Sequence, residues 1–173
     1  MILPKEQVEL FFKLYIPLLG YANQHDGLNK KRPLNEARDI LYKNANIIRN
    51  FANTNPEKFK RNEIEIIKSW EKFVQGDFVL IRSLKKYSVF LRMGNDKSEI
   101  YGVLGLNDSP VDLALYGIGT YFENVVLLPW QDKIIWDGLM CQKPIILGKN
   151  YMHSFTEEYK KAKQVGKIIE TIG

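Results

Sequence analysis

The sequence predicts an α+β fold, with three N-terminal helices, a mostly antiparallel curled sheet or small barrel of five to six strands, and one C-terminal helix. Apolar residues recur every three or four positions before Gly76, whereas after Gly76 they alternate with polar residues. The connections between the alternating segments are too short for the crossovers that parallel pairing needs. Antiparallel strands joined by tight turns are therefore expected.

Helical periodicity accounts for the first part of the chain. Apolar stripes at helical spacing cover residues 8–22, 33–51 and 59–74. Pro56 restrains the residue before it and so ends the second helix. The polar segment 23–32 between the first two helices is expected to be an exposed loop.

Strand patterns fill most of the second part. Met93–Asp96 has the glycine and asparagine of a hairpin turn. Ser109 and Pro110 have the residue types that begin a helix, so a short helix is expected near 109–116. Ser154 and Glu157 have the spacing of a capping box at the start of the last helix. Strands are expected at 77–84, 86–93, 98–106, 121–129, 133–141 and 144–148.

Length and spacing predict one domain that spans residues 1–173. Its expected parts are a helical part at 1–75, a β part at 76–150 and the C-terminal helix at 151–173, with no long linker between them. The junction at 75–77 is too short to let two halves move freely. We therefore expect one cooperative unit.

Composition favours a soluble, cytoplasmic protein. The chain has one cysteine, so it can form no internal disulfide, and no apolar run approaches the ~20 residues of a membrane span. Residues 1–75 hold 13 Lys and Arg against 9 Asp and Glu, which gives +4 of the total charge of +5. The basic excess therefore lies almost wholly in the helical part.

The segment 125–139 reads as a strand, a tight polar turn and a second strand. It contains Leu127-Leu128-Pro129-Trp130, then Ile134-Ile135-Trp136-Asp137-Gly138-Leu139, and the run 101–106 lies upstream. This pattern resembles a segment of poorly characterised bacterial proteins. The resemblance covers about residues 98–148 and implies no established activity.

Asp137 is the strongest candidate for a catalytic group. Alternation places apolar residues on both faces of its strand, so its carboxylate should be buried, where it must find donors or have its pKa raised. A hydrolase would use Asp137 with Asp132 or Glu123 to activate water. The structural alternative, which we favour, is an Asp-Gly turn in which Asp137 accepts backbone N–H groups.

Metal, nucleophile and nucleotide motifs are weak. His25 and His153 are far apart in sequence, and neither has a second ligand at helical spacing. Cys141 has no basic neighbour that would activate its thiol, so we expect it in the core. Gly117 and Gly119 begin a dinucleotide-like pattern without its third glycine or its helix. No cofactor and no metal are expected.

Basic side chains raise the hypothesis of nucleic-acid binding. An anion-binding patch would comprise Lys30, Lys31, Arg32, Lys58, Lys60 and Arg61, if the loop and the third helix met on one side. The first hairpin adds Arg82, Lys85, Lys86 and Arg92, with Tyr87 or Phe90 available to stack on bases. The alternative is a set of ordinary solvated faces.

The function we favour from the sequence is a non-enzymatic binding or interaction module. Large amphipathic rings supply much of the energy of desolvated contacts, and the candidate anchors are Tyr116, Tyr121, Trp130 and Trp136. A protein is the first expected partner and a nucleic acid the second, with no membrane. The same region could instead belong to the core, which is the interpretation we favour for Trp136, and the sequence does not define an oligomeric state.

Overall fold

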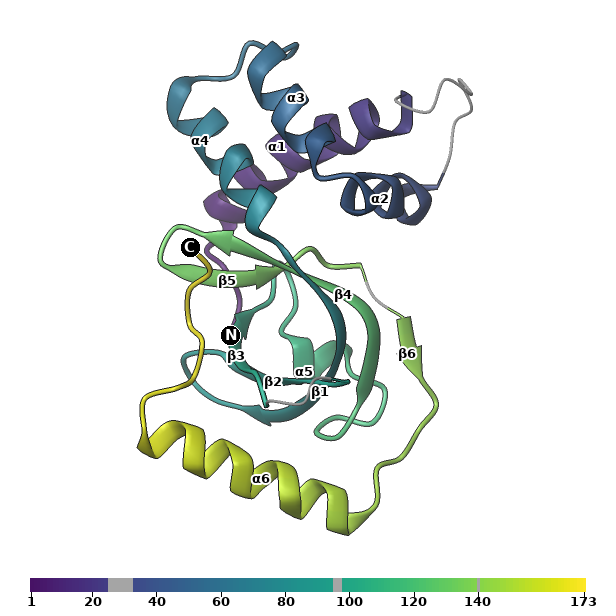
Figure 1. Cartoon of the computed structure of the whole chain (residues 1–173), viewed down its shortest axis with the longest axis vertical. Coiled ribbons are helices and arrows are strands. Elements are labelled where there is room, and N and C mark those ends of the chain that lie inside the picture. The colour runs from purple at the N-terminus through teal and green to yellow at the C-terminus, as the bar shows by residue number, and fades with distance from the viewer. Residues whose placement is uncertain (25–32, 95–97, 140) are drawn as a thin grey trace. The chain divides into compact units, whose positions relative to one another are not determined.

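The computed structural model describes residues 1–24, 33–94, 98–139 and 141–173. The chain divides into two compact units (Figure 1). The helical unit is Pro4–Lys72, and the barrel unit consists of Met1–Leu3 together with Phe73–Gly173.

The helical unit contains α1 (Lys5–Gln24), α2 (Leu34–Lys43), α3 (Asn46–Thr54), α4 (Arg61–Ser69) and a short 3₁₀ turn, η1 (Trp70–Lys72). The expected single helix over 33–51 is wrong, because the helix breaks between α2 and α3. There the side chain of Asn44 accepts a hydrogen bond from the Asn46 N–H at 3.2 Å. Asparagine breaks helices in this way by offering the backbone a local alternative partner.

Aromatic rings form the centre of the helical unit. Phe11 and Tyr15 stack with their ring centroids 4.8 Å apart, and both meet the ring of Trp70 edge to face. All three side chains are buried. Trp70 directly follows α4, so the contact fixes the end of α4 against α1.

The barrel unit contains six strands: β1 (Val74–Ser83), β2 (Ser88–Arg92), β3 (Ile100–Leu104), β4 (Tyr121–Trp130), β5 (Lys133–Trp136) and β6 (Cys141–Lys143). The sheet order is β1-β2-β3-β5-β4-β6, and β1 also pairs with β4, so the first five strands close into a ring. All strand pairs are antiparallel except β3 with β5. The expected α+β class and mostly antiparallel sheet are confirmed.

Two expected strands differ from the structure. The predicted strand at 144–148 is wrong, because that segment has no strand pairing; the sixth strand lies at Cys141–Lys143. β5 ends at Trp136 rather than continuing to residue 141, since Gly138 takes a φ of +82° and turns the chain away from β4. The expected short helix is present as α5 (Pro110–Leu113), after β3.

Aromatic side chains fill the barrel. Phe90 lies 5.7 to 6.1 Å, between ring centroids, from Phe78, Phe122 and Trp136. These rings come from β1, β2, β4 and β5, and each is at most 1% exposed. The closed ring of strands therefore surrounds a packed core rather than a channel.

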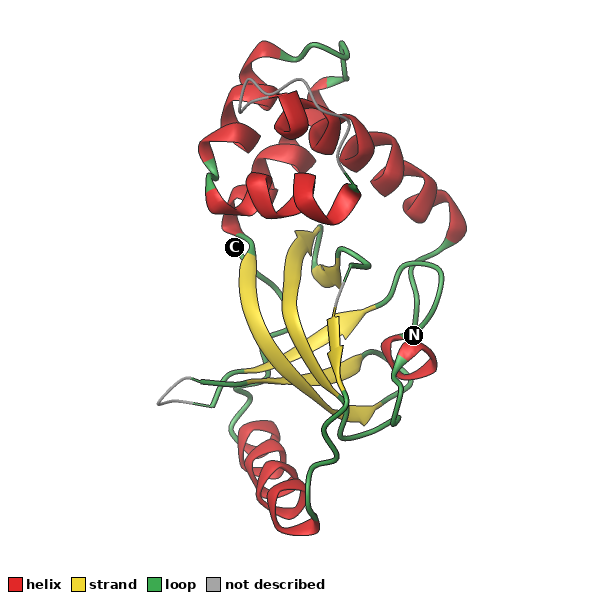
Figure 2. Ribbon diagram, turned by 90° about the vertical axis from the view of Figure 1, so that its right-hand side faces the viewer, coloured by secondary structure: helices red, strands yellow, loops and turns green. Residues whose placement is uncertain are grey.

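The last helix, α6 (Lys149–Gln164), covers the outer face of β1 to β3 (Figure 2). Phe155 and Tyr159 pack there with Val79, Val89 and Leu91. The expected capping box is wrong: α6 begins at Lys149, so Ser154 lies inside the helix.

The expectation of one cooperative domain stays a prediction, and tryptophan placement allows a direct test. Trp70 lies in the helical unit, whereas Trp130 and Trp136 lie in the barrel unit. The variant Trp70→Phe keeps only the tryptophans of the barrel unit, and the double variant Trp130→Phe/Trp136→Phe keeps only that of the helical unit. For each variant, we expect the urea transition followed by fluorescence to coincide with the transition followed by circular dichroism. Separate fluorescence and dichroism midpoints would show that the units unfold independently.

Candidate functional site

The described part of the barrel unit contains a pocket of about 200 Å³. Lys86 and Tyr87 contribute from the β1–β2 turn, Gly102 from β3, and Asp132 and Lys133 from the β4–β5 turn and the start of β5. The remaining wall includes Glu170, near the C-terminus. Segments that lie far apart in sequence therefore build one site.

Gly102 is a glycine because the ring of Tyr87 lies against it. A Cβ atom at position 102 would lie 2.9 Å from two ring atoms of Tyr87, closer than real Cβ contacts allow. Gly102 keeps regular register with Val89 of β2, so it marks no bulge. The absent side chain instead makes room for an aromatic wall of the pocket.

Tyr87, Lys86 and Glu170 form the polar cluster of the pocket. The Tyr87 hydroxyl donates to Glu170 Oε1 at 2.9 Å, and the Lys86 ammonium forms an ion pair with Glu170 Oε2. Burial of the phenol and its bond to Glu170 raise the pKa of Tyr87 to about 12. The Lys86 ammonium and the Tyr87 hydroxyl lower the pKa of Glu170, so the carboxylate is ionised at neutral pH.

Two contacts bring lysine-rich segments together next to this pocket. The guanidinium of Arg82 lies over the ring of Tyr159, with 5.1 Å between Cζ and the ring centroid, so the end of β1, just before the β1–β2 turn, is next to the second half of α6. The same turn contacts Glu170 through Lys86. The chain between these two contacts is rich in lysine. We define the barrel basic cluster as Arg82, Lys85, Lys86, Lys160, Lys161, Lys163 and Lys167.

The anion patch expected in the helical unit is only partly described. Lys30, Lys31 and Arg32 lie outside the described residues, as does His25. Lys58, Lys60 and Arg61 are exposed at the start of α4. Because the two units are not placed relative to each other, joining of this patch to the hairpin basic residues stays a prediction.

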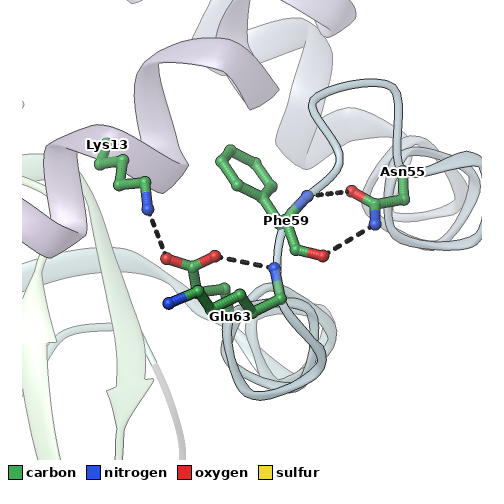
Figure 3. Close-up of polar contacts among 5 residues, drawn as sticks. Lys13, Asn55, Phe59 and Glu63 are labelled. Atoms are coloured by element: carbon green, nitrogen blue, oxygen red, sulfur yellow. Dashed lines mark hydrogen bonds and ion pairs between the residues drawn. The ribbon is translucent and has the colours of Figure 1, made fainter.

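A buried carboxylate organises the start of α4 (Figure 3). Glu63 accepts from the Lys60 backbone N–H at 2.8 Å and from Lys13 Nζ of α1 at 2.5 Å, and both donors lower its pKa. Beside it, Asn55 exchanges two hydrogen bonds with the backbone of Phe59. Glu63 and Asn55 thus hold the segment that presents Lys58 and Lys60 to solvent.

Among the basic residues expected on the first hairpin, Arg92 and Lys86 have charged partners, whereas Arg82 lies over the ring of Tyr159. Arg92 donates to Glu99 at 2.8 Å, and Lys86 pairs with Glu170. The expected stacking role of Phe90 is wrong, because its side chain is inside the barrel and 0% exposed. Tyr87 lines the pocket but is largely covered.

The three candidate catalytic carboxylates lie in different surroundings. Asp137 is buried, and its Oδ1 accepts the Leu139 N–H at 3.2 Å, as expected for the structural alternative. Asp132 is on the β4–β5 turn and lines the pocket, whereas Glu123 pairs with Lys143 at 3.1 Å. Glu123 lies near the start of β4, and Asp132 follows the end of β4. The seven residue steps from Glu123 to Trp130, at about 3.3 Å each, span up to roughly 23 Å. The hydrolase hypothesis stays a prediction that this arrangement does not favour.

The candidate aromatic anchors divide into buried and exposed groups. Trp130 and Trp136 are each 1% exposed, so neither ring is accessible to a partner in this structure. Tyr121 is half-buried and donates to Asp77 Oδ2 at 2.9 Å. Tyr116 is exposed, and it is the one of the four that presents its ring to solvent.

Exposed apolar side chains occur on two neighbouring segments, 113–118 and 145–151. Gln142 joins β6 to the chain at the end of α5. Its side-chain amide donates a hydrogen bond to the Leu113 carbonyl at 2.8 Å and accepts one from the Leu115 N–H at 2.6 Å. We define the apolar patch as Leu113, Leu115, Tyr116, Ile118, Ile145, Ile146 and Tyr151. Exposed apolar patches of this kind mark contact surfaces in many proteins.

Other expected features are reported for the described residues. No group of three His, Cys, Asp or Glu side chains there could hold a metal ion. The expected core position of Cys141 is wrong, because its side chain is exposed on the edge strand β6. Among the described helices, none is long and apolar enough to cross a membrane.

Comparison with known proteins gives no identity. No protein-family model matches the sequence, no curated protein matches it significantly, and no solved structure is significantly similar to it. The resemblance of residues 98–148 to bacterial proteins therefore stays a prediction. Function has to be argued from the geometry.

Three tyrosines of the barrel predict alkaline destabilisation. Burial, with hydrogen bonds to carboxylates, raises the pKa of Tyr87, Tyr101 and Tyr121 to about 12. A phenol whose pKa is higher in the folded protein stabilises the fold fully below the unfolded pKa, near 10, and loses this contribution as pH rises to about 12. We expect the urea midpoint of the barrel to fall between pH 10 and 12.

The matched variant for this prediction is Tyr101→Phe, which removes one of the three phenols. Its fall in midpoint over the same pH interval should be smaller by about a third, since each phenol contributes up to one proton. An identical fall in the variant and the wild type would contradict the assignment.

Proposed function

We propose that the barrel unit binds single-stranded nucleic acid, without catalysis, at the pocket and the adjacent barrel basic cluster. The observation that carries the proposal is the position of the pocket between the β1–β2 turn, β3 and the β4–β5 turn of a closed five-stranded barrel. The sequence had placed nucleic acid second among the expected partners.

The strand arrangement supports this choice of ligand. Five strands in the order β1-β2-β3-β5-β4, closed by β1 with β4, match the arrangement of the OB-fold. OB-folds bind oligonucleotides and oligosaccharides on the face of strands 2 and 3 and with the loops that join strands 1–2 and 4–5. Here α6 packs on part of that face, at Val89 and Leu91, and the pocket lies beside the covered part, at Gly102. This support is an analogy between folds, so the charges of the site must carry the choice between the two ligands.

Charge favours the nucleic acid. Residues 82–87 and 157–170 hold the seven cationic side chains of the barrel basic cluster against three acids, Glu157, Glu158 and Glu170. This excess is local, because the other charged side chains of the barrel unit sum to −3, from 5 Lys and Arg against 8 Asp and Glu. A single strand has one negative charge per phosphate and releases condensed cations when lysine neutralises it. The exposed side chains of Lys85, Lys163 and Lys167 are suited to such contacts, because they are long and hydrated.

The test is fluorescence anisotropy of a labelled 15-residue oligo-dT at two salt concentrations. We expect affinity to fall at least tenfold between 50 and 200 mM NaCl, roughly as known for proteins with several phosphate contacts. Lys85→Gln/Lys163→Gln/Lys167→Gln should weaken binding and reduce the slope of log affinity against log salt by about 2, since each phosphate contact on a single strand contributes about 0.7.

The matched control is Lys58→Gln/Lys60→Gln/Arg61→Gln, which removes the same charge from the helical unit. It should change affinity by less than threefold. A larger loss in this control than in the barrel variant would assign binding to the helical unit instead, and no binding at 50 mM NaCl would reject nucleic acid as the ligand.

The apolar patch favours a second candidate function, contact with a protein. Ile146 is 79% exposed and Leu115 is 63% exposed, in a region that Gln142 holds together by two hydrogen bonds. Burying such side chains gains about 25 cal/mol per Å² of apolar surface. The most direct partner to test is a second copy of the chain.

We expect sedimentation of the wild type to show concentration-dependent association that Ile146→Lys and Leu115→Lys each abolish. Ile16→Lys is the matched control, because Ile16 is 44% exposed but lies in the helical unit. A monomer at all concentrations would reject self-association through the patch.

A further inference from the structure

The course of the chain after α6 is set by one glycine. Gly166 takes a φ of +64°, and the Lys167 N–H donates to the Ala162 carbonyl at 2.8 Å while the Gly166 N–H donates to the Lys163 carbonyl at 3.3 Å. These two bonds make a Schellman motif, which ends a helix and turns the chain sharply. The motif directs residues 167–173, here called the C-terminal tail, back over the barrel (Figure 1).

The tail pairs with β3 at a single residue. The Ile169 N–H donates to the Ile100 carbonyl at 2.8 Å, and the Gly102 N–H donates to the Ile169 carbonyl at 2.9 Å. This is a parallel bridge between Ile169 and Tyr101. The pairing leaves the next side chain, Glu170, at the pocket.

Glu170 occupies an anion-binding position of the pocket. Its two carboxylate oxygens separately accept from the Lys86 ammonium and the Tyr87 hydroxyl. An ammonium and a hydroxyl together are suited to any anionic oxygen group, and a phosphate diester offers two such oxygens. A phosphate could therefore take both donors in place of the carboxylate.

We propose that Glu170 is a built-in substitute for a nucleic-acid phosphate, and that a single strand enters the pocket by displacing the C-terminal tail from Lys86 and Tyr87. The inference rests on the proposed function of the barrel and names the group that competes with its ligand. It predicts that the wild-type chain binds more weakly than a chain without the Glu170 charge.

The contacts of the tail make displacement feasible. The side chains of Lys86 and Glu170 are 72% and 37% exposed, and an ion pair this exposed adds little to stability. Beyond Lys167, the described structure gives the tail two backbone hydrogen bonds, both at Ile169. The Schellman motif lies before these contacts, so the tail can leave β3 without unwinding α6.

The experiment compares Glu170→Gln with Glu157→Gln in binding to the labelled oligo-dT at 50 mM NaCl. Both variants remove one negative charge and one ion pair with lysine, since Glu157 pairs with Lys160 at 2.8 Å on α6. Glutamine keeps an oxygen for the Tyr87 hydroxyl, so the fold should persist, and Glu170→Ala provides a second variant. We expect Glu170→Gln to tighten binding at least fivefold more than Glu157→Gln does.

A double variant locates the effect. Lys86→Gln should cost more affinity in the Glu170→Gln background than in the wild type, because in the wild type the lost phosphate contact is partly offset by the loss of the competing ion pair with Glu170. Inorganic phosphate at millimolar concentration should compete with the oligonucleotide without matching its affinity.

The outcomes separate the two proposals. Equal effects of Glu170→Gln and Glu157→Gln on a wild type that binds would overturn the role of Glu170 and leave the proposed function standing. Absence of oligonucleotide binding by the wild type and by both Glu170 variants, with their folds intact, would overturn both. Binding of inorganic phosphate but not of oligonucleotide by Glu170→Gln would overturn the nucleic acid as the competing ligand.

Discussion

β1 pairs with β2 on one side and with β4 on the other, and the barrel depends on this double pairing. Ten residues are enough for both partners because register shifts near Gly76 and Leu80 bend the strand. Closure removes the open edges that a flat sheet of these strands would expose. It also encloses Phe78, Phe90, Phe122 and Trp136 in one interior.

Closure of the barrel also determines where the pocket forms. The β1–β2 turn and the β4–β5 turn both border the pocket, although more than 40 residues separate them in sequence. A parallel pair, β3 with β5, brings the second turn beside β3. The mixed charges of the pocket thus come from segments that only the closed topology brings together.

Periodicity predicts the elements better than their limits. The two-residue period after Gly76 predicts the first three strands and the hairpin of β4 and β5, because the aromatic interior imposes alternation on each strand. The break at Asn44 depends on a local side-chain bond, and the position of β6 depends on pairing with β4. Residue spacing does not report such interactions.

The candidate site is less predictable than the fold. Tyr87 and Lys86 are recognisable as aromatic and basic residues of a turn, but the bonds of Glu170 to them span more than 80 residues. The need for glycine at position 102 cannot be recognised in the sequence either, since it comes from the ring of Tyr87, which precedes β2 in the chain. Trp136 and Asp137 are the opposite case: their residue types and positions suggested site residues, but burial in the hairpin accounts for both side chains.

Cys141 is the single thiol of the chain, and it is exposed on the edge strand β6, away from the residues that line the pocket. A maleimide dye would therefore attach at one defined position of the native barrel, without prior removal of competing cysteines. Energy transfer from such a dye to a second one introduced in α1 to α4 would report how the helical unit is oriented in solution. The only reactive sulfur in the sequence is thus a ready attachment point for measuring motion between the two halves.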